Sequence, residues 1–142
     1  MGGRGKSVLV IVHPGSACGS ADFNLGSTEA AEARYALGRT IHNWQGPAVV
    51  LNNEFKGELS FYAQIGLALS SLRDPIEVDA CASDPRWTEI ARSTLTGSAG
   101  EHFVLTGAWH HPADRSGCID AVSGILDEEG LDWEIAPCAF RL

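Results

Sequence analysis

The sequence predicts one α/β domain, a three-layer Rossmann-like sandwich built on a mostly parallel, five-stranded sheet. Three observations lead to this fold class. Short apolar runs alternate along the chain with longer segments in which apolar residues recur every three or four positions, as in successive β-α-β units. The chain has 142 residues, close to the commonest size of a single domain. Apolar residues make up 44% and charged residues 20% of it, so neither disorder nor a linker is indicated.

The first half of the chain predicts two strands and two helices after a tail, residues 1–6, that we expect to be disordered. Residues 8–12 are consecutively apolar and predict a buried strand. A Ser-Thr pair can cap a helix over 27–44, which a Gly-Pro pair ends. Residues 48–51 form a second apolar strand, and an apolar stripe from about 58 to 72 predicts the second helix.

The second half predicts three further strands and two helices. Apolar and acidic residues alternate over 76–80, as in a strand with one solvated face. An Asp-Pro pair at 84–85 predicts the start of the third helix, because Pro is favoured at the first helical position. A fourth strand follows over 102–109, a fourth helix over 116–129 with Gly at its end, and a last strand over 131–135.

The acidic residues of the third strand decide between two strand orders. An order of 2-1-3-4-5 would bury this strand in the centre, where Glu77 and Asp79 would lose their hydration. An order of 3-2-1-4-5 leaves it at the edge and makes the first and fourth strands neighbours. Ligands of open α/β sheets bind at the carboxyl ends of the strands where the order reverses. We therefore expect a crevice after the first and fourth strands.

Two similar loops follow these two strands. Each loop carries an imidazole, a hydroxyl and a thiol: His13, Ser16 and Cys18 in the first, and His111, Ser116 and Cys118 in the second. Parallel neighbouring strands would bring the loops together as two walls of one pocket.

Cys118 is the first candidate nucleophile. It lies near the start of the fourth predicted helix, where free N–H groups and the helix dipole stabilise a thiolate and can also bind an oxyanion. His13, His110 or His111 would act as its base. A Cys118 whose alkylation shows an unshifted or raised pKa would refute this hypothesis of an activated thiolate. The alternative is a small buried residue at a crowded helix start, because free Cys is often buried.

Four groups of the expected crevice could bind a ligand beside Cys118. Cys18 is a second candidate nucleophile, in a segment of small residues whose amides could approach an anion or simply form a turn. Glu54, after the second strand, could orient an imidazole or accept a proton. Trp109 could form a pocket wall, although core packing is the alternative. The small residues that we expect to contact ligand are Gly15, Ser16, Ser20, Ser116 and Gly117.

A zinc site is the remaining possibility for the two loops. His13, His111, Cys18 and Cys118 supply two nitrogen and two sulfur ligands, but their spacings differ from the compact pairs of common zinc modules. We expect no metal and no cofactor.

Charge and hydropathy narrow the partners. Ten Lys and Arg against eighteen Asp and Glu give a net charge of −8, which would repel nucleic acid and anionic membranes. The longest apolar run is too short for an export signal or a membrane span. We expect a cytoplasmic protein with reduced thiols that binds a small molecule and can form a homo-oligomer.

Part of the chain resembles the isochorismatase-like cysteine hydrolases. The resemblance rests on Leu105-Thr106-Gly107-Ala108-Trp109, on Gly117 to Val122 and on Gly130 to Ile135, about a quarter of the chain. It implies that Cys118 is the nucleophile at a helix start. The family's Asp after the first strand is replaced by His13, and its Lys has no counterpart near 76–80 unless Lys56 approaches from another loop.

The leading hypothesis is a small-molecule hydrolase with Cys118 as nucleophile in the crevice between the first and fourth strands. One alternative is a non-catalytic domain that binds a phosphate or carboxylate group through loop amides. The other is an oligomeric structural protein without a ligand.

Overall fold

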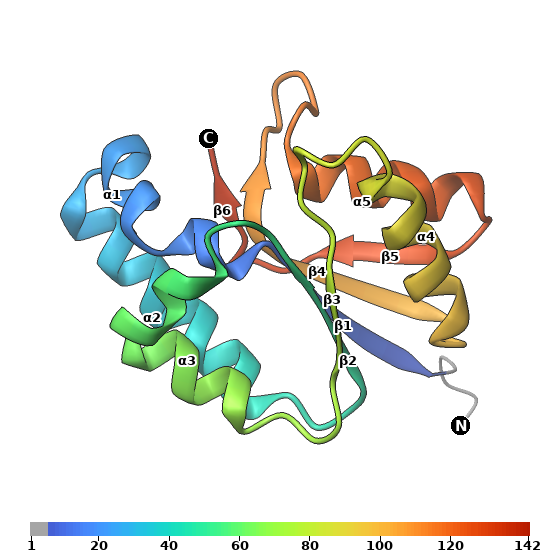
Figure 1. Ribbon diagram of the computed structural model, residues 1–142, viewed down its shortest axis with the longest axis horizontal. Coiled ribbons are helices and arrows are strands. Elements are labelled where there is room, and N and C mark those ends of the chain that lie inside the picture. The colour runs from blue at the N-terminus through green and yellow to red at the C-terminus, as the bar shows by residue number, and fades with distance from the viewer. Residues whose placement is uncertain (1–5) are drawn as a thin grey trace.

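The computed structural model describes residues 6–142, with Gly19 and Ser20 described by their backbone alone. Its centre is a parallel sheet with the strand order β3-β2-β1-β4-β5, and a sixth strand also pairs with β4 (Figure 1). This confirms the predicted order. The strands are β1 (Ser7–Val12), β2 (Ala48–Asn52), β3 (Ile76–Asp79), β4 (His102–His110), β5 (Asp132–Ile135) and β6 (Phe140–Arg141).

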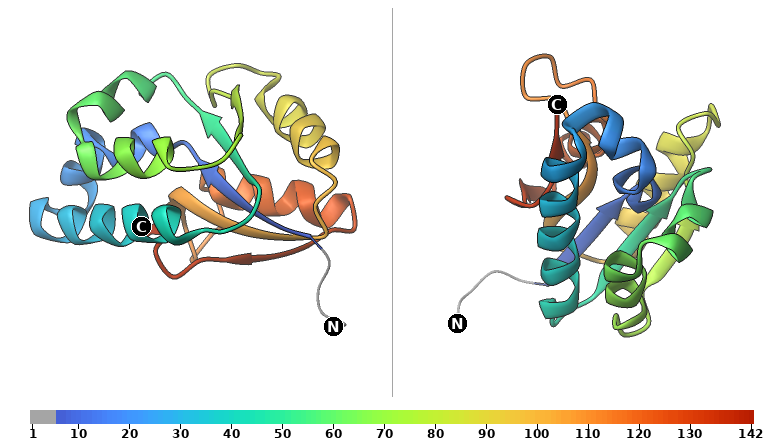
Figure 2. Two further views of the ribbon diagram at one scale, coloured as in Figure 1. Left: turned by 90° about the horizontal axis from the view of Figure 1, so that it is seen from below. Right: turned by 90° about the vertical axis from the view of Figure 1, so that its left-hand side faces the viewer.

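Helices cover both faces of the sheet and make the fold a three-layer sandwich (Figure 2). On one face, Leu9 and Ile11 of β1 pack under α1 (Gly19–Leu25), α2 (Ser27–Asn43) and α3 (Ala63–Ser70). On the other face, Val8 and Val10 pack under α4 (Trp87–Gly97) and α5 (Cys118–Glu128). Because side chains alternate in direction along a strand, those of β1 pack into two separate cores, one on each face of the sheet.

The acidic strand β3 lies at the edge of the sheet, as its composition predicts. Glu77 and Asp79 are exposed, and Asp79 pairs with Lys56 at 2.9 Å. By contrast, all residues of β2 are buried between β1 and β3. An edge position lets the two carboxylates keep their hydration.

Four elements differ from the sequence prediction. The loop after β1 contains a 3-10 turn, η1 (Pro14–Ala17), and then α1, where the sequence predicted only a polar loop. The helix predicted from residue 58 begins instead as a 3-10 segment, η2 (Lys56–Phe61), before α3. The strand β6 was not predicted. It adds to β4 beyond the end of β5, at Ala108 and His110.

Lys6 belongs to the folded part of the chain. Its ammonium group donates a hydrogen bond to the Ser98 carbonyl at 2.6 Å, and its own carbonyl accepts bonds from the Glu101 and His102 amides. The remainder of the predicted disordered tail, residues 1–5, lies outside the described residues.

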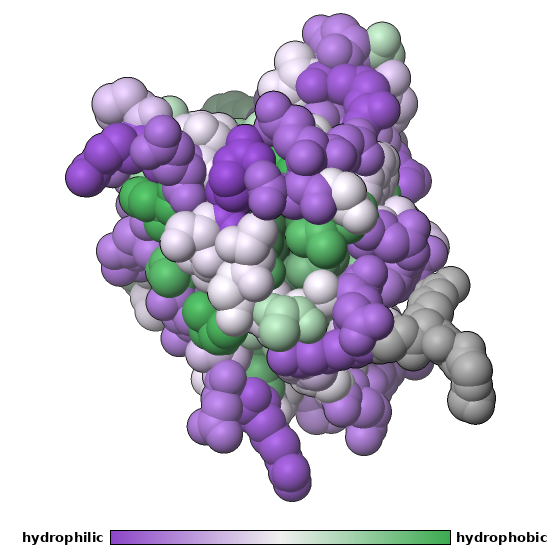
Figure 3. All heavy atoms as spheres, turned by 90° about the vertical axis from the view of Figure 1, so that its right-hand side faces the viewer, coloured by the Kyte–Doolittle hydropathy of each residue, from purple (hydrophilic) through white to green (hydrophobic). Residues whose placement is uncertain are grey.

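The surface is mainly hydrophilic on the face that includes the ends of α4 and α5, with smaller apolar patches between polar side chains (Figure 3). Within residues 6–142, no helix is both long and apolar enough to cross a membrane.

Candidate functional site

His13 is fixed at the carboxyl end of β1 in an unusual backbone conformation. Its φ of 46° and ψ of 59° are left-handed, and this turns the imidazole toward β3 and α4. There Nε2 donates a hydrogen bond to the Ala80 carbonyl at 2.7 Å, and the ring lies 5.4 Å from the ring of Trp87. Burial lowers the pKa of His13, against the opposing effects of the Ala80 carbonyl and Glu54. The ring is therefore neutral at pH 7 and carries its proton on Nε2.

Glu54 is the residue shared by a cluster of side chains from the ends of β1, β2 and β3 and the start of α5. It follows β2 and interacts electrostatically with His13 after β1, Cys81 after β3 and Cys118 at the start of α5. Cys81 also forms a side-chain hydrogen bond with it. Glu54 itself is exposed to solvent, whereas both thiols are half-buried. A solvent-accessible carboxylate thus influences the pKa values of one imidazole and two thiols at this edge of the sheet.

Cys118 occupies the predicted position but not the predicted protonation state. It is the first residue of α5, directly after the N-cap residue Gly117. Burial, and then the carboxylates of Glu54 and Asp120, raise its pKa above the ordinary value of 9.0. This direction is opposite to the expected thiolate stabilised by the helix start, because burial and two nearby carboxylates all favour the neutral thiol. At neutral pH the side chain is a thiol.

Asp120 is the residue around which the loop before α5 folds. Its side chain is fully buried and accepts hydrogen bonds from His110 Nδ1 at 2.6 Å, the His111 amide at 2.8 Å and the Gly117 amide at 3.1 Å. Burial alone would raise the pKa of Asp120, but these hydrogen bonds outweigh it and lower the pKa. The carboxylate is ionised, so it is the acceptor of the hydrogen bond that His110 donates from Nδ1.

The two histidines of this loop, predicted as candidate bases, each contact another side chain of the loop or of α5. His110 is oriented by Asp120, and His111 Nδ1 lies 3.1 Å from the hydroxyl of Ser116. The charged groups that shift the pKa of Cys118 are the carboxylates Glu54 and Asp120. Of these two carboxylates, Asp120 is fully buried and hydrogen-bonded, whereas Glu54 is exposed to solvent.

The two cysteines of the similar loops lie on opposite faces of the sheet. Cys18 is buried in the core under α1, α2 and α3, whereas Cys118 packs against the core under α4 and α5. Burial raises the pKa of Cys18 to about 11. The two loops do follow neighbouring strands, but the sheet separates their thiols, so they are not two walls of one pocket. Cys18 is a core residue.

The small residues of the first loop are used for packing. A Cβ on Gly15 would lie 2.5 Å from the backbone carbon and oxygen of Phe55, so only Gly fits there. The hydroxyl of Ser16, which is buried, accepts a hydrogen bond from the side-chain amide (Nδ2) of Asn53 at 2.8 Å. The side chain of Ser20 lies outside the described residues. These contacts hold the loop against the segment after β2, which carries Glu54.

The second loop likewise has its amides engaged. The Gly117 amide bonds to Asp120, and the Ser116 amide bonds to Asp114 at 3.1 Å. An anion at this helix start would meet both carboxylates, which disfavours the phosphate- or carboxylate-binding alternative. Trp109 packs edge-on against Phe140, with ring centroids 5.7 Å apart, on the face opposite Cys118. It is a core residue rather than a wall of the cluster.

Asp120, Cys81 and Trp87 are the site residues that the sequence analysis missed. Asp120 had a signal, since an acid three residues after the N-cap reaches back to the free N–H groups of a helix start. Cys81 follows the predicted edge strand directly, so its position at the carboxyl end of the sheet was also available from the sequence.

The donor sets for metal are sparse. Among residues 6–142, no group of three or more His, Cys, Asp or Glu side chains is arranged to hold a metal ion. The four ligands considered for zinc are divided by the sheet, because Cys18 is on one face and Cys118 on the other.

Comparison of the chain with protein-family models, with curated proteins and with solved structures finds no match. The chemistry of the site must therefore be argued from its own residues.

Proposed function

We propose that this protein is a thiol-dependent hydrolase of small, uncharged amides or esters, with Cys118 as nucleophile and Glu54 as proton acceptor. One observation carries the proposal. The charge of the Glu54 carboxylate raises the pKa of Cys118, a half-buried thiol at a helix start, and it also raises the pKa of His13 against the larger effect of burial. A thiol that is protonated at rest needs a base at the moment of attack, and a neighbouring carboxylate supplies one.

The reaction has two steps. In the first, the sulfur of Cys118 bonds to the substrate carbonyl carbon while its proton passes to Glu54. The carbon–nitrogen or carbon–oxygen bond then breaks, and Glu54 returns the proton to the leaving amine or alcohol. In the second, water attacks the thioester, Glu54 takes a proton from the water, and the thiol of Cys118 is released with the carboxylic acid.

His13 has a positioning role in this proposal. Its Nε2–H is engaged by Ala80, so Nδ1 is its remaining polar atom and can only accept a hydrogen bond while the ring is neutral. A substrate amide N–H is a suitable donor to it. His13 would thus help to select and orient the substrate, while Glu54 moves the proton.

The proposal retains part of the resemblance to isochorismatase-like hydrolases. It keeps the nucleophile at position 118 and assigns the acid–base role to Glu54, after the second strand, because His13 stands where the family has Asp. Lys56 is paired with Asp79 on the exposed edge, so we assign no catalytic role to it.

The charge of the cluster sets the substrate class. Glu54 and Asp120 are both negative, Asp114 lies in the loop before α5, and His13 is neutral. The chain as a whole carries a charge of −8. A carboxylate- or phosphate-bearing substrate would be repelled, so an uncharged amide or ester is the better fit.

Hydrolysis of p-nitrophenyl acetate and p-nitroacetanilide tests the proposal. In the wild type, we expect mass spectrometry to detect the acetylated enzyme that forms in the first step. Cys118→Ala should abolish both turnover and this acetylation. Glu54→Gln should lower kcat by about 100-fold. Cys138→Ala is the matched control, because Cys138 is also half-buried but packs on the other face of the sheet.

The pH dependence of alkylation separates a catalytic from a structural role of Glu54. Since Glu54 raises the pKa of Cys118, Glu54→Gln should shift the alkylation profile of this thiol to lower pH while hydrolysis slows. The proposal is refuted if Cys118→Ala hydrolyses both substrates like the wild type, or if the wild type neither hydrolyses nor becomes acetylated.

A further inference from the structure

Helix α2 presents an exposed stripe with an unusual order of residues. Its outer face carries, from start to end, Thr28, Glu29, Glu32, Tyr35, Ala36, Arg39, His42 and Asn43. With about 3.6 residues per turn, these positions all fall within one side of the helix. Tyr35 at the centre is 61% exposed. The helix lies on the outside of the molecule, so that one of its sides is open to solvent along its length (Figure 2).

The stripe is complementary to itself when two copies run antiparallel. The midpoint lies between Tyr35 and Ala36, and Glu32 and Arg39 are equally far from it on opposite sides. Glu29 and His42 are also equally far from it. A two-fold axis through the midpoint therefore places Glu32 of one copy opposite Arg39 of the second copy, and Glu29 opposite His42. Each of these pairings occurs twice in a symmetric dimer.

The acidic groups of the stripe are not used within the chain. In the part of the chain that the structure describes, no ion pair involves Glu29 or Glu32. Arg39 lies over the ring of Tyr35, 5.9 Å from its centroid. The guanidinium and the aromatic ring thus sit together at the middle of the stripe, and both residue types are enriched at the centres of protein interfaces.

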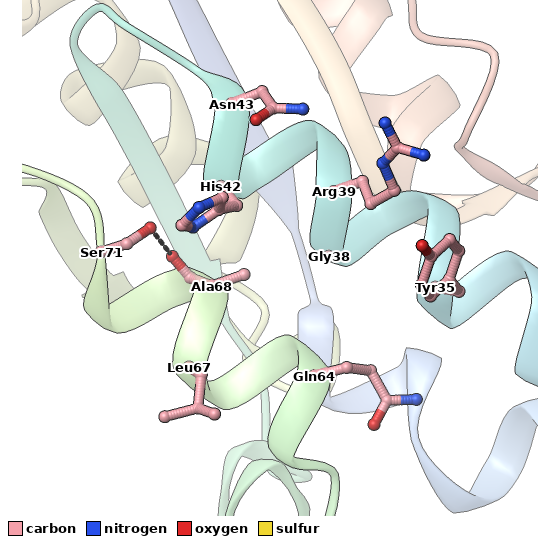
Figure 4. Close-up of a pocket in the computed structure, with 9 residues that line it drawn as sticks. All are labelled: Tyr35, Gly38, Arg39, His42, Asn43, Gln64, Leu67, Ala68 and Ser71. Carbon is pink, nitrogen blue, oxygen red and sulfur yellow. Dashed lines mark hydrogen bonds between the residues drawn. The ribbon is translucent and has the colours of Figure 1, made fainter.

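Hollows flank the stripe on both sides. One, of about 390 Å³, lies between α2 and α3, with Gly38 and Ala68 along it and Leu67 at its rim (Figure 4). Leu67 is 71% exposed. The other lies along the far side of α2 and is lined by Tyr35, Thr40 and Trp44 among others. A helix with a groove on each side can receive the side-chain ridges of a second helix.

We propose that the α2 stripe is the interface of a symmetric dimer, and that its partner is a second copy of this chain. The charge order supplies the argument for this occupant, because another acidic or basic partner would match only one half of the stripe. The interface consists of one helix and its flanks, so it is small. We therefore expect a dimer of about micromolar Kd that weakens as salt screens the ion pairs.

Sedimentation velocity over a range of protein concentrations tests the proposal through a charge swap. Glu32→Arg and Arg39→Glu, each alone, place like charges opposite each other twice and should raise Kd about tenfold or more. The double variant Glu32→Arg with Arg39→Glu restores opposite charges and should recover the wild-type Kd within about threefold.

Glu89→Arg is the matched control. Glu89 is exposed near the start of α4, so the variant changes the net charge by the same amount as Glu32→Arg and should leave Kd unchanged. Circular dichroism confirms that each variant is folded. The proposal is overturned by a wild type that stays monomeric up to about 1 mM, by a Glu32→Arg effect no larger than that of Glu89→Arg, or by a double variant as weak as the single ones.

Discussion

Replacing Asp120 by Ala tests the central assertion about the loop before α5. The substitution removes the acceptor of three hydrogen bonds, from the His110 ring and from the amides of His111 and Gly117. The Gly117 amide is buried, whereas His110 and His111 are partly accessible. One buried donor left unpaired costs about 1–3 kcal/mol, and the two accessible donors recover part of their loss from water. The helix start also loses a favourable negative charge, which contributes about 0.3–1 kcal/mol.

We therefore expect Asp120→Ala to lower the free energy of unfolding by about 2–4 kcal/mol, as the sum of these contributions. With a urea m-value of about 2 kcal/mol/M, the unfolding midpoint falls by about 1–2 M. Asp127→Ala is the control in the same helix, since Asp127 accepts one exposed hydrogen bond from Trp133 at 2.7 Å. A midpoint shift for Asp120→Ala no larger than that of the control would refute the reasoning.

The pH dependence of Asp120 provides a second readout. The pKa of this carboxyl is lower in the folded than in the unfolded protein, so the unfolded state binds more protons at acidic pH. Its stabilising contribution is complete above the ordinary pKa of 3.8 and disappears as the pH falls through the depressed folded value. The difference in unfolding midpoint between wild type and Asp120→Asn should therefore become smaller in strong acid. A difference that stays constant would contradict the lowered pKa of Asp120 in the folded protein.

Three further predictions concern the loop after β1. Because burial lowers the pKa of His13, the neutral ring stabilises the fold above its ordinary pKa of 6.5, and this stability falls as the pH drops below it. His13→Asn, which tolerates the left-handed backbone, should flatten that slope in urea titrations between pH 7 and about pH 5; an unchanged slope would contradict the assignment. Gly15→Ala should lower the unfolding free energy by about 1–3 kcal/mol through its clash with Phe55, while Gly57→Ala, with open space at its Cβ, should not. Iodoacetamide should label Cys18 last of the four cysteines, since it is buried and its pKa is raised to about 11; early labelling in peptide mass spectra would show that this core opens.

The sheet could be predicted from the sequence because its strands have different environments. Only an edge strand tolerates Glu77 and Asp79, and this single fact selects the strand order that makes β1 and β4 neighbours. The short helix α1 could not be predicted, because its exposed Phe23 and its polar residues give no inward stripe. It is held instead by Arg34 of α2, which bonds to the Cys18 carbonyl at 3.2 Å and to Asp22.

The strand order predicted which loops lie at the carboxyl edge of the sheet. It did not predict which side chains of these loops lie close to each other. Glu54 and Cys118 follow strands whose positions were predicted, so both were expected at the carboxyl edge. The direction of each side chain depends on details that residue types do not reveal. The left-handed backbone of His13 turns its ring toward Ala80, and the 3-10 turn after it carries Cys18 into the core under α2. The two loops thus follow neighbouring strands, as predicted, but their thiols pack on opposite faces of the sheet.

The strand β6 pairs with the end of β4 that β5 leaves uncovered in the folded sheet. β5 covers β4 from His102 to Leu105, and β6 takes over along the same strand at Ala108 and His110. Without Phe140–Arg141, the last third of β4 would present unpaired backbone groups beside the apolar ring of Trp109. An open strand end of this kind is a template for adding strands from other chains. Two residues at the end of the chain therefore act as a cover against fibril-like growth, although they contribute little to the area of the sheet.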